Sequence, residues 1–185
     1  NELTEEEKVR DALPAGFVLE NDNKRYTILN YISCGAFGYT YRADMLNQQN
    51  GIKEIVAIKE FYPRLREQGI VSYRENSQSN RMKVDLDNPD QEKLFKDMRK
   101  MFYKEGDFLR RMSDAPDNHV TEFKSLFDNE PTGTIYYSMK LYKGATLDDM
   151  IKDGQIPTSE PLIINNIVIP LCKALHTMEE HKILH

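Results

Sequence analysis

The apolar and polar positions of the chain begin with patterns typical of β-strands. Residues 26–32 (YTILNYI) and 39–43 (YTYRA) are rich in β-branched and aromatic residues, which favour strands. The small-residue segment 33–38 (SCGAFG) separates them, so the sequence predicts a hairpin over 26–43. Residues 55–61 (IVAIKEF) are nearly continuous in apolar character and predict a third strand.

After residue 90 the apolar positions change to a helical spacing of three and four. They predict a helix over 90–112, which Asp90 can cap directly after Pro89. The apolar positions of this helix are Leu94, Phe95, Met98, Met101, Phe102, Phe108, Leu109 and Met112. Residues 62–90 are polar and contain Pro63, so the sequence predicts a loop or an insertion there.

The remaining pattern predicts two more strands and two helices. Residues 120–127 and 134–141 would form a second hairpin. Thr146 opens a capping-box-like pattern for a short helix that ends at Gly154. A last helix is predicted from residues 159–161 onward, with an apolar stripe made of Ile164, Ile167, Val168, Leu171, Leu175 and Met178. Three strands, a helix, two strands and then helices predict an α+β fold with a mainly antiparallel sheet.

The composition is typical of a soluble globular chain. It has 185 residues, 39% hydrophobic and 30% charged, and 25 Lys+Arg against 30 Asp+Glu give a net charge of −5. This acidic balance gives no reason to expect a nucleic-acid partner. No apolar run approaches the roughly 20 residues of a membrane span, so we expect no membrane segment in the chain. Cys34 and Cys172 are too few for a disulfide scaffold, which predicts a reducing, cytoplasmic location.

Two opposite charges stand out inside apolar patterns. Glu105 lies on the apolar stripe of the predicted helix over 90–112, and Lys59 follows the apolar residues 55–58. Taken singly, Glu105 could reach water from a half-buried helix, and Lys59 could be a solvated charge at a strand end. Because a buried charge needs a partner, the two together predict a buried Lys59–Glu105 pair.

The turn over 33–38 is a third feature. Its glycines, Gly35 and Gly38, would let backbone N–H groups approach phosphate oxygens closely. Many hairpins contain glycine, so the turn alone is not specific. It is not a Walker-type loop, and it is not a dinucleotide-binding fingerprint because a strand follows it.

In this order the three features match one known arrangement, namely a glycine hairpin, a V-A-I-K strand and a helix that supplies a glutamate. The sequence resembles the protein kinase family, and most closely the bacterial serine/threonine kinases. Their G-F-G-I-T-Y-like hairpin and I-K-E-Y-F-P-like strand correspond here to residues 36–41 (AFGYTY) and 58–63 (IKEFYP). The resemblance extends from about residue 13 to residue 185.

The resemblance implies a kinase-like α+β fold with a five-stranded antiparallel sheet and one αC-type helix. Residues 1–12 would be a leader, residues 13–142 a nucleotide-binding N-terminal lobe up to the hinge, and residues 143–185 the first helices of a truncated C-terminal lobe. The implied nucleotide site consists of Ile32, Ser33, Cys34, Gly35, Ala36, Phe37, Gly38, Thr40, Ala57, Lys59, Met139, Lys140 and Tyr142.

Within this implied site, Ile32, Thr40 and Ala57 would wall the adenine. The turn 33–38 would cover the phosphates, although Ser33 replaces the first glycine of the family pattern.

The catalytic pair implied by the resemblance is Lys59, which would hold the α- and β-phosphates, and Glu105, which would orient it. Met139 would be the gatekeeper and residues 140–142 the hinge. Leu109 would be a spine residue behind Glu105.

The resemblance implies that the chain is the ATP-binding N-terminal part of a kinase that transfers the γ-phosphoryl group of Mg·ATP to Ser or Thr hydroxyls of proteins. His185 resembles the start of the H-R-D motif. The catalytic Asp and the groups that bind Mg²⁺ would therefore lie outside this chain, and the 185 residues alone are expected to be inactive. The spacing of His and Cys predicts no metal site in the chain.

ATP is the implied ligand, and the protein substrate stays unknown. A truncated lobe would expose apolar surface along its last helix, so we expect self-association. Two alternatives remain open. The first is a pseudokinase or interaction scaffold with a kinase fold, which the sequence following residue 185 would distinguish. The second is an unrelated α+β protein, in which Lys59 and Glu105 would lie far apart.

Overall fold

The structure is a computed structural model, and it describes residues 9–76, 79–113, 119–156 and 159–180. The chain divides into two compact units. The first consists of residues 1–107 and 123–141, and the second of residues 108–122 and 142–185. The predicted leader therefore falls mostly outside the described residues, and so does the predicted H-R-D-like end at 183–185.

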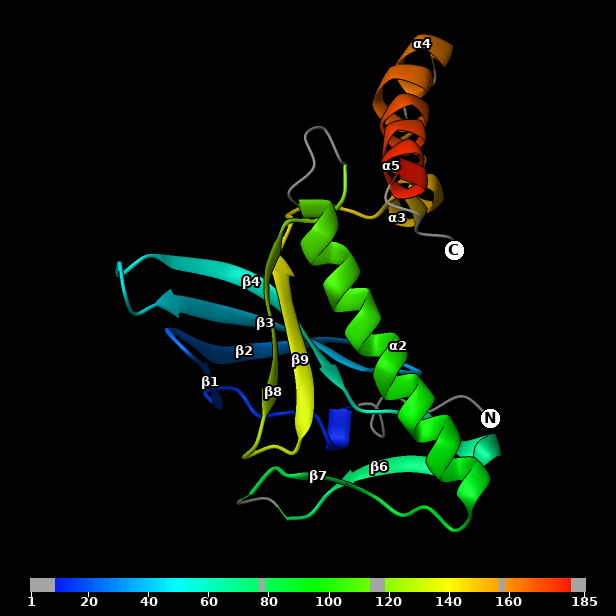
Figure 1. The fold of residues 1–185 in the computed structure, drawn as a ribbon. Coiled ribbons are helices and arrows are strands. Elements are labelled where there is room, and N and C mark those ends of the chain that lie inside the picture. The colour runs from blue at the N-terminus through cyan, green and yellow to red at the C-terminus, as the bar shows by residue number, and fades with distance from the viewer. Residues whose placement is uncertain (1–8, 77–78, 114–118, 157–158, 181–185) are drawn as a thin grey trace. The chain divides into compact units, whose positions relative to one another are not determined.

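The first unit is built on a six-stranded antiparallel sheet in the order β1-β2-β3-β4-β9-β8 (Figure 1). The strands are β1 (Val18–Asn21), β2 (Lys24–Gly35), β3 (Gly38–Asn47), β4 (Lys53–Phe61), β8 (Phe123–Asn129) and β9 (Thr134–Lys140). Strand β1 also contacts β8, so the sheet is nearly closed. The α+β class and the antiparallel sheet are confirmed.

The expected number of strands is wrong, because the structure has a sixth strand, β1, at the start of the sheet. This strand has only four residues, Val18–Asn21, and turns directly into β2 through Asp22, which has a φ of 47°. So short a segment shows too few alternations to be recognised from its pattern.

Aromatic side chains dominate the core of the first unit. Along β3, Tyr39, Tyr41, Ala43 and Met45 are buried in alternation with more exposed residues, as expected for a half-buried strand. On the opposite face of the sheet, the ring of Phe102 lies 5.5 Å from that of Phe61 and 5.0 Å from that of Tyr137.

The polar segment 62–90 is a small sheet, and its prediction as a loop is wrong. Strands β5 (Arg64–Leu65), β6 (Ile70–Arg74) and β7 (Met82–Val84) form a three-stranded antiparallel sheet, with the 3₁₀ turn η1 (Arg66–Gln68) between β5 and β6. We call β5–β7 the insert sheet. Its strands are short, and Ile70 and Ser72 are the only buried residues of β6, so the apolar signal is weak.

The long helix α2 (Pro89–Ser113) confirms the predicted helix. Its portion up to residue 107 packs on the sheet through Met98 and Phe102, which are buried. Gly106 permits this close packing, because a Cβ there would lie 3.0 Å from Leu126 Cδ1 and 3.2 Å from Tyr137 Cβ.

The second unit holds the remaining helices. Helix α3 (Leu147–Lys152) begins with the predicted capping box, in which Thr146 and Asp149 bond to each other's backbone N–H groups. The last predicted helix is continuous but contains a π-helical turn: α4 (Glu160–Ile163), η2 (Ile164–Val168) and α5 (Ile169–Glu180). Pro170, the second residue of α5, lacks the N–H group that a regular helix would need there.

Most of the apolar stripe of α4, η2 and α5 is exposed. The exposed large apolar residues of these helices are Leu162, Ile164, Val168, Ile169, Leu171 and Leu175, of which Leu162 and Ile169 lie outside the predicted stripe. Among the described residues, the stretch Glu160–Glu180 has the length and composition of a membrane-spanning helix. Core helices of soluble proteins meet the same criterion, so the cytoplasmic location stays a prediction.

Candidate functional site

Lys59 and Glu105 form an ion pair, with Lys59 Nζ 2.9 Å from Glu105 Oε1. Lys59 lies on β4, where it pairs with Thr40 of β3 and Tyr137 of β9. Glu105 comes from α2, 46 residues further along the chain. The predicted contact between Lys59 and Glu105 is therefore present.

The expectation that this pair is buried is wrong. The side chain of Lys59 is 25% exposed and that of Glu105 is 44% exposed. The helix surface beside Glu105 is open to solvent, since Tyr103 and Lys104 are exposed as well. An ion pair this exposed contributes only about 0–1 kcal/mol to stability. The pair therefore adds little to the stability of the fold.

Tyr137 is a member of this site that the sequence analysis missed. Its hydroxyl donates to Glu105 Oε1 at 2.8 Å, and Lys59 Nζ lies 5.6 Å from the centroid of its ring. Burial, followed by the charge and hydrogen bond of Glu105, raises the pKa of Tyr137 above its usual value, so its hydroxyl stays a donor. Nothing in the strand pattern distinguishes Tyr137 from an ordinary core aromatic residue.

Several predicted nucleotide-site residues share one face of the sheet. Directly opposed residues and residues two apart on a strand point to the same face. Thr40 opposes Lys59, and Ala57 lies two residues before Lys59 and opposes Met139. Thr40, Ala57, Lys59 and Met139 therefore lie together on the face that α2 covers.

The predicted glycine turn is held by backbone hydrogen bonds to the chain that follows β4. The N–H of Tyr62 donates to Phe37 O at 2.8 Å, and the N–H of Arg64 donates to Ala36 O at 3.1 Å. Gly38 has a φ of 147°, and a Cβ there would overlap the carbonyl oxygen of Glu60. Only glycine fits this position, which brings the turn against the end of β4.

The other predicted residues are less closely gathered. Ser33 opposes Thr40, whereas Ile32 lies in an irregularity of the β2–β3 register and is exposed. Cys34 and Gly35 end β2, and Lys140, which is exposed, ends β9. Tyr142 and Leu109 belong to the second unit, whereas Lys59 belongs to the first.

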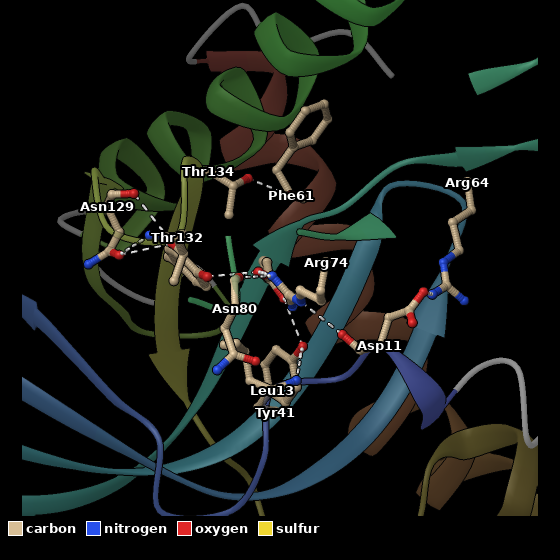
Figure 2. Close-up of polar contacts among 12 residues, drawn as sticks. Asp11, Leu13, Tyr41, Phe61, Arg64, Arg74, Asn80, Asn129, Thr132 and Thr134 are labelled. Carbon is tan, nitrogen blue, oxygen red and sulfur yellow. Dashed lines mark hydrogen bonds and ion pairs between the residues drawn. The ribbon is translucent and has the colours of Figure 1, made fainter. Parts of the chain in front are cut away.

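The residue after Lys59 is the centre of a buried polar network that the sequence analysis missed, and Figure 2 labels Tyr41 and Arg74 of this network. Glu60 is 0% exposed, and both of its carboxylate oxygens accept from Arg74, at 2.9 Å from Nη1 and 2.8 Å from Nη2. The hydroxyls of Tyr41 and Tyr136 also donate to Glu60, each at 2.7 Å. The carboxylate therefore receives four hydrogen bonds.

The electrostatics of this network follow from its burial. Burial alone would lower the pKa of Arg74, but the charge and hydrogen bonds of Glu60 raise it above its usual value. Burial and the charge of Glu60 raise the pKa values of Tyr41 and Tyr136 well above the usual range. The arginine stays charged and both hydroxyls stay protonated. The one signal in the sequence is a glutamate inside the apolar strand 55–61.

An open groove lies elsewhere on the first unit, outside the predicted nucleotide site. It has a volume of about 430 Å³ and runs between α2 and the β8–β9 hairpin. Its lining residues are Lys96, Arg99, Lys100, Tyr103, Lys104, Asp128 and Ile135. No group of three or more His, Cys, Asp and Glu side chains that could hold a metal ion is found within the described part of the chain.

Comparison with models of known protein families and with curated proteins finds no match for this chain.

Proposed function

We propose that this chain binds ATP and is the nucleotide-binding part of a serine/threonine protein kinase, which transfers the γ-phosphoryl group of ATP to Ser or Thr hydroxyls of proteins. The observation that carries the proposal is the 2.9 Å contact between Lys59 Nζ and Glu105 Oε1. The contact lies on a sheet face that also holds Thr40 and Ala57, next to the strand that leaves the glycine turn.

In the proposed site, Lys59 acts as a point charge on the α- and β-phosphates. Glu105 holds the ammonium group in place, and the Tyr137 hydroxyl holds Glu105. The partial exposure of the pair keeps the ammonium group accessible to a ligand. Backbone N–H groups of the turn 33–38 would lie over the phosphates, where they need no side chain to act as donors.

Kinase chemistry also needs Mg²⁺, which neutralises the charge that develops on the phosphates. The residues described here do not fit a Mg²⁺ site. The one carboxylate at the proposed site, Glu105, is already paired with Lys59, and the sequence contains no Asp-Phe-Gly string. No step of the reaction is assigned to a metal held by these residues.

The test is nucleotide binding by the 185-residue chain, measured with a fluorescent ATP analogue and by competition with ATP, ADP and adenosine. Lys59→Met removes the ammonium group but keeps most of the stem. We expect it to weaken ATP and ADP binding about tenfold or more, because a hydrogen bond to a charged group contributes about 1.5–3 kcal/mol. Adenosine binding should be unchanged, since Lys59 contacts only phosphates in the proposal.

The matched control is Lys53→Met, which removes an exposed lysine from the same strand and should leave all three affinities unchanged. An absence of saturable nucleotide binding, or equal binding by Lys59→Met and the unaltered chain, would contradict the proposal. Binding of ATP without any role for Lys59 would favour the interaction scaffold.

A further inference from the structure

The segment 11–13, which precedes the sheet, is held in place by hydrogen bonds to residues distant in sequence (Figure 2). Asp11 accepts from Arg64 Nη2 at 2.5 Å through its carboxylate and from Arg74 Nε at 3.0 Å through its carbonyl. The N–H of Leu13 donates to the Tyr41 hydroxyl at 3.1 Å, and the Leu13 side chain is buried. We call residues 11–13 the strap.

Arg64 joins the strap to the glycine turn. Its side chain is 3% exposed and lies against two rings, 5.2 Å from the centroid of Tyr39 and 5.3 Å from that of Tyr62. Its backbone N–H donates to Ala36 O in the turn. The same residue therefore contacts the strap through its guanidinium group and the turn through its backbone.

Arg74 joins the strap to the strand that carries Lys59. Its guanidinium group binds the strap carbonyl through Nε and the buried carboxylate of Glu60 through both Nη atoms. Glu60 directly follows Lys59 on β4. Arg74 itself belongs to β6, so the insert sheet supplies the side chain that links the strap to β4.

We infer that the strap positions the glycine turn and the Lys59 strand through Arg64 and Arg74, so that nucleotide affinity depends on whether residues 11–13 are docked. This inference rests on the proposed function. Asp11, Arg64 and Arg74 act as positioning residues, since the proposal gives none of them a contact with nucleotide. When the strap leaves, the buried Arg64 guanidinium group loses its contact with the Asp11 carboxylate, which costs free energy. In the inference, movement of the chain at 62–64, which holds the turn, lowers that cost.

If the strap only added stability, its loss would have a different effect on amide exchange. Its loss would favour unfolding of the whole unit and raise amide exchange at every protected position. Loss of a positioning strap raises exchange first at the hydrogen bonds between the turn and the segment 62–64. The β8–β9 hairpin makes none of the strap's hydrogen bonds and serves as an internal reference.

The experiment is hydrogen–deuterium exchange on Asp11→Ala in the 185-residue chain. The amides of Tyr62 and Arg64 report directly on the turn, because they donate to Phe37 O and Ala36 O. We expect exchange there to rise about tenfold, while exchange in the β8–β9 hairpin changes less than twofold. Affinity for the fluorescent ATP analogue should fall about threefold to tenfold.

Asp44→Ala is the matched control. Asp44 is an exposed aspartate on β3 whose side chain makes no hydrogen bond or ion pair with another described residue. It should leave both exchange and affinity unchanged. A second variant, Arg64→Met, removes the charge that Asp11 binds. If the two residues act through one contact, the double variant Asp11→Ala, Arg64→Met opens the turn no further than Arg64→Met alone.

Unchanged exchange at Tyr62 and Arg64 in Asp11→Ala would overturn the inference, and so would an equal rise in the β8–β9 hairpin. Asp11→Asn keeps the shape of the side chain and replaces Asp11→Ala if the latter fails to fold, as judged by circular dichroism. Exchange does not depend on nucleotide. If the unaltered chain binds no nucleotide, the proposed function and the control of affinity both fail, and the exchange result still decides whether the strap positions the turn.

Discussion

Glu60 provides the sharpest test of how the first unit is held together. Glu60→Gln keeps the shape of the side chain but removes its charge and replaces one acceptor oxygen with a donor NH₂ group. In the folded chain, four donated hydrogen bonds reach this carboxylate, two from Arg74 and one each from Tyr41 and Tyr136. The amide can accept at only one of its two ends, and its NH₂ group faces donors.

The size of the expected stability loss follows from the burial of Glu60 and Arg74. Glu60 is 0% exposed and the Arg74 side chain is 9% exposed, so the substitution leaves a buried guanidinium charge without its counter-charge. Removal of one partner of a buried ion pair typically costs about 3–5 kcal/mol. That is a large part of the roughly 5–15 kcal/mol that stabilises a typical domain. For a chain of this size it corresponds to a fall in Tm of about 6–20 °C.

The assay is urea and thermal unfolding followed by near-ultraviolet circular dichroism. The chain contains 10 Tyr and no Trp, and the buried tyrosine rings gather in the first unit, so the signal reports mainly on that unit. This matters because a chain with two units need not unfold in one step.

Glu54→Gln is the matched control for this experiment. Glu54 lies on the same strand and pairs with Lys124 at 2.6 Å, but its side chain is 39% exposed. Its loss should cost less than about 1 kcal/mol. The double variant Glu60→Met, Arg74→Met should lose less stability than the sum of its single changes, since no buried charge is left unpaired. A Glu60→Gln chain within about 1 kcal/mol of the unaltered chain would refute the reasoning.

Four further outcomes are expected. Glu105→Gln should change the free energy of unfolding by less than about 1 kcal/mol, because its ion pair is exposed, yet weaken ATP binding; a large stability loss in urea would contradict this. Gly38→Ala should destabilise the fold by more than about 1–3 kcal/mol in the same assay, because its Cβ would overlap the backbone at Glu60 and its φ is 147°. Leu171→Glu should reduce self-association in light scattering at several concentrations, and equal association would show that the exposed stripe of α5 is not involved. Stability should fall as pH rises above about 10, because unfolded tyrosines lose their protons there while folded ones, whose pKa values are raised by burial, keep them. The loss is about 1.4 kcal/mol per pH unit for each residue, and pH-dependent urea unfolding would show no such slope if these hydroxyls were solvated. The residues concerned are Tyr26, Tyr39, Tyr41, Tyr62, Tyr136 and Tyr137.

Much of the fold was predictable because the sequence patterns that indicate its elements involve only neighbouring residues. The helical spacing from Leu94 to Met112 agrees with α2, and the capping box at Thr146 begins α3. The insert sheet was not predictable, because its strands are short and polar and are held largely by contacts with distant residues. Arg74, for example, looks like a loop cation in the sequence but is bonded to Glu60, Asn80 and the strap.

The candidate site likewise has one part that was predictable from the sequence and one part that was not. The contact between Lys59 and Glu105 was predictable because each charge interrupts an apolar pattern. Tyr137, which bonds to Glu105, has no comparable signal, because a tyrosine on a half-buried strand is an ordinary core residue. The strap was equally hidden, since residues 11–13 acquire their role only through arginines at positions 64 and 74.

The sequence by itself determined the long strands and helices, since side-chain periodicity is a property of neighbouring residues, but it did not determine the short strands β1, β5, β6 and β7. It also placed two glutamates, Glu60 and Glu105, inside apolar patterns, and the expectation of burial fell on Glu105. Only the tertiary structure decided which of them is buried. Glu60 is fully enclosed and Glu105 is 44% exposed. The free energy of burying a charge depends on partners that the fold brings from elsewhere, and only Glu60 receives a buried arginine and two tyrosine hydroxyls.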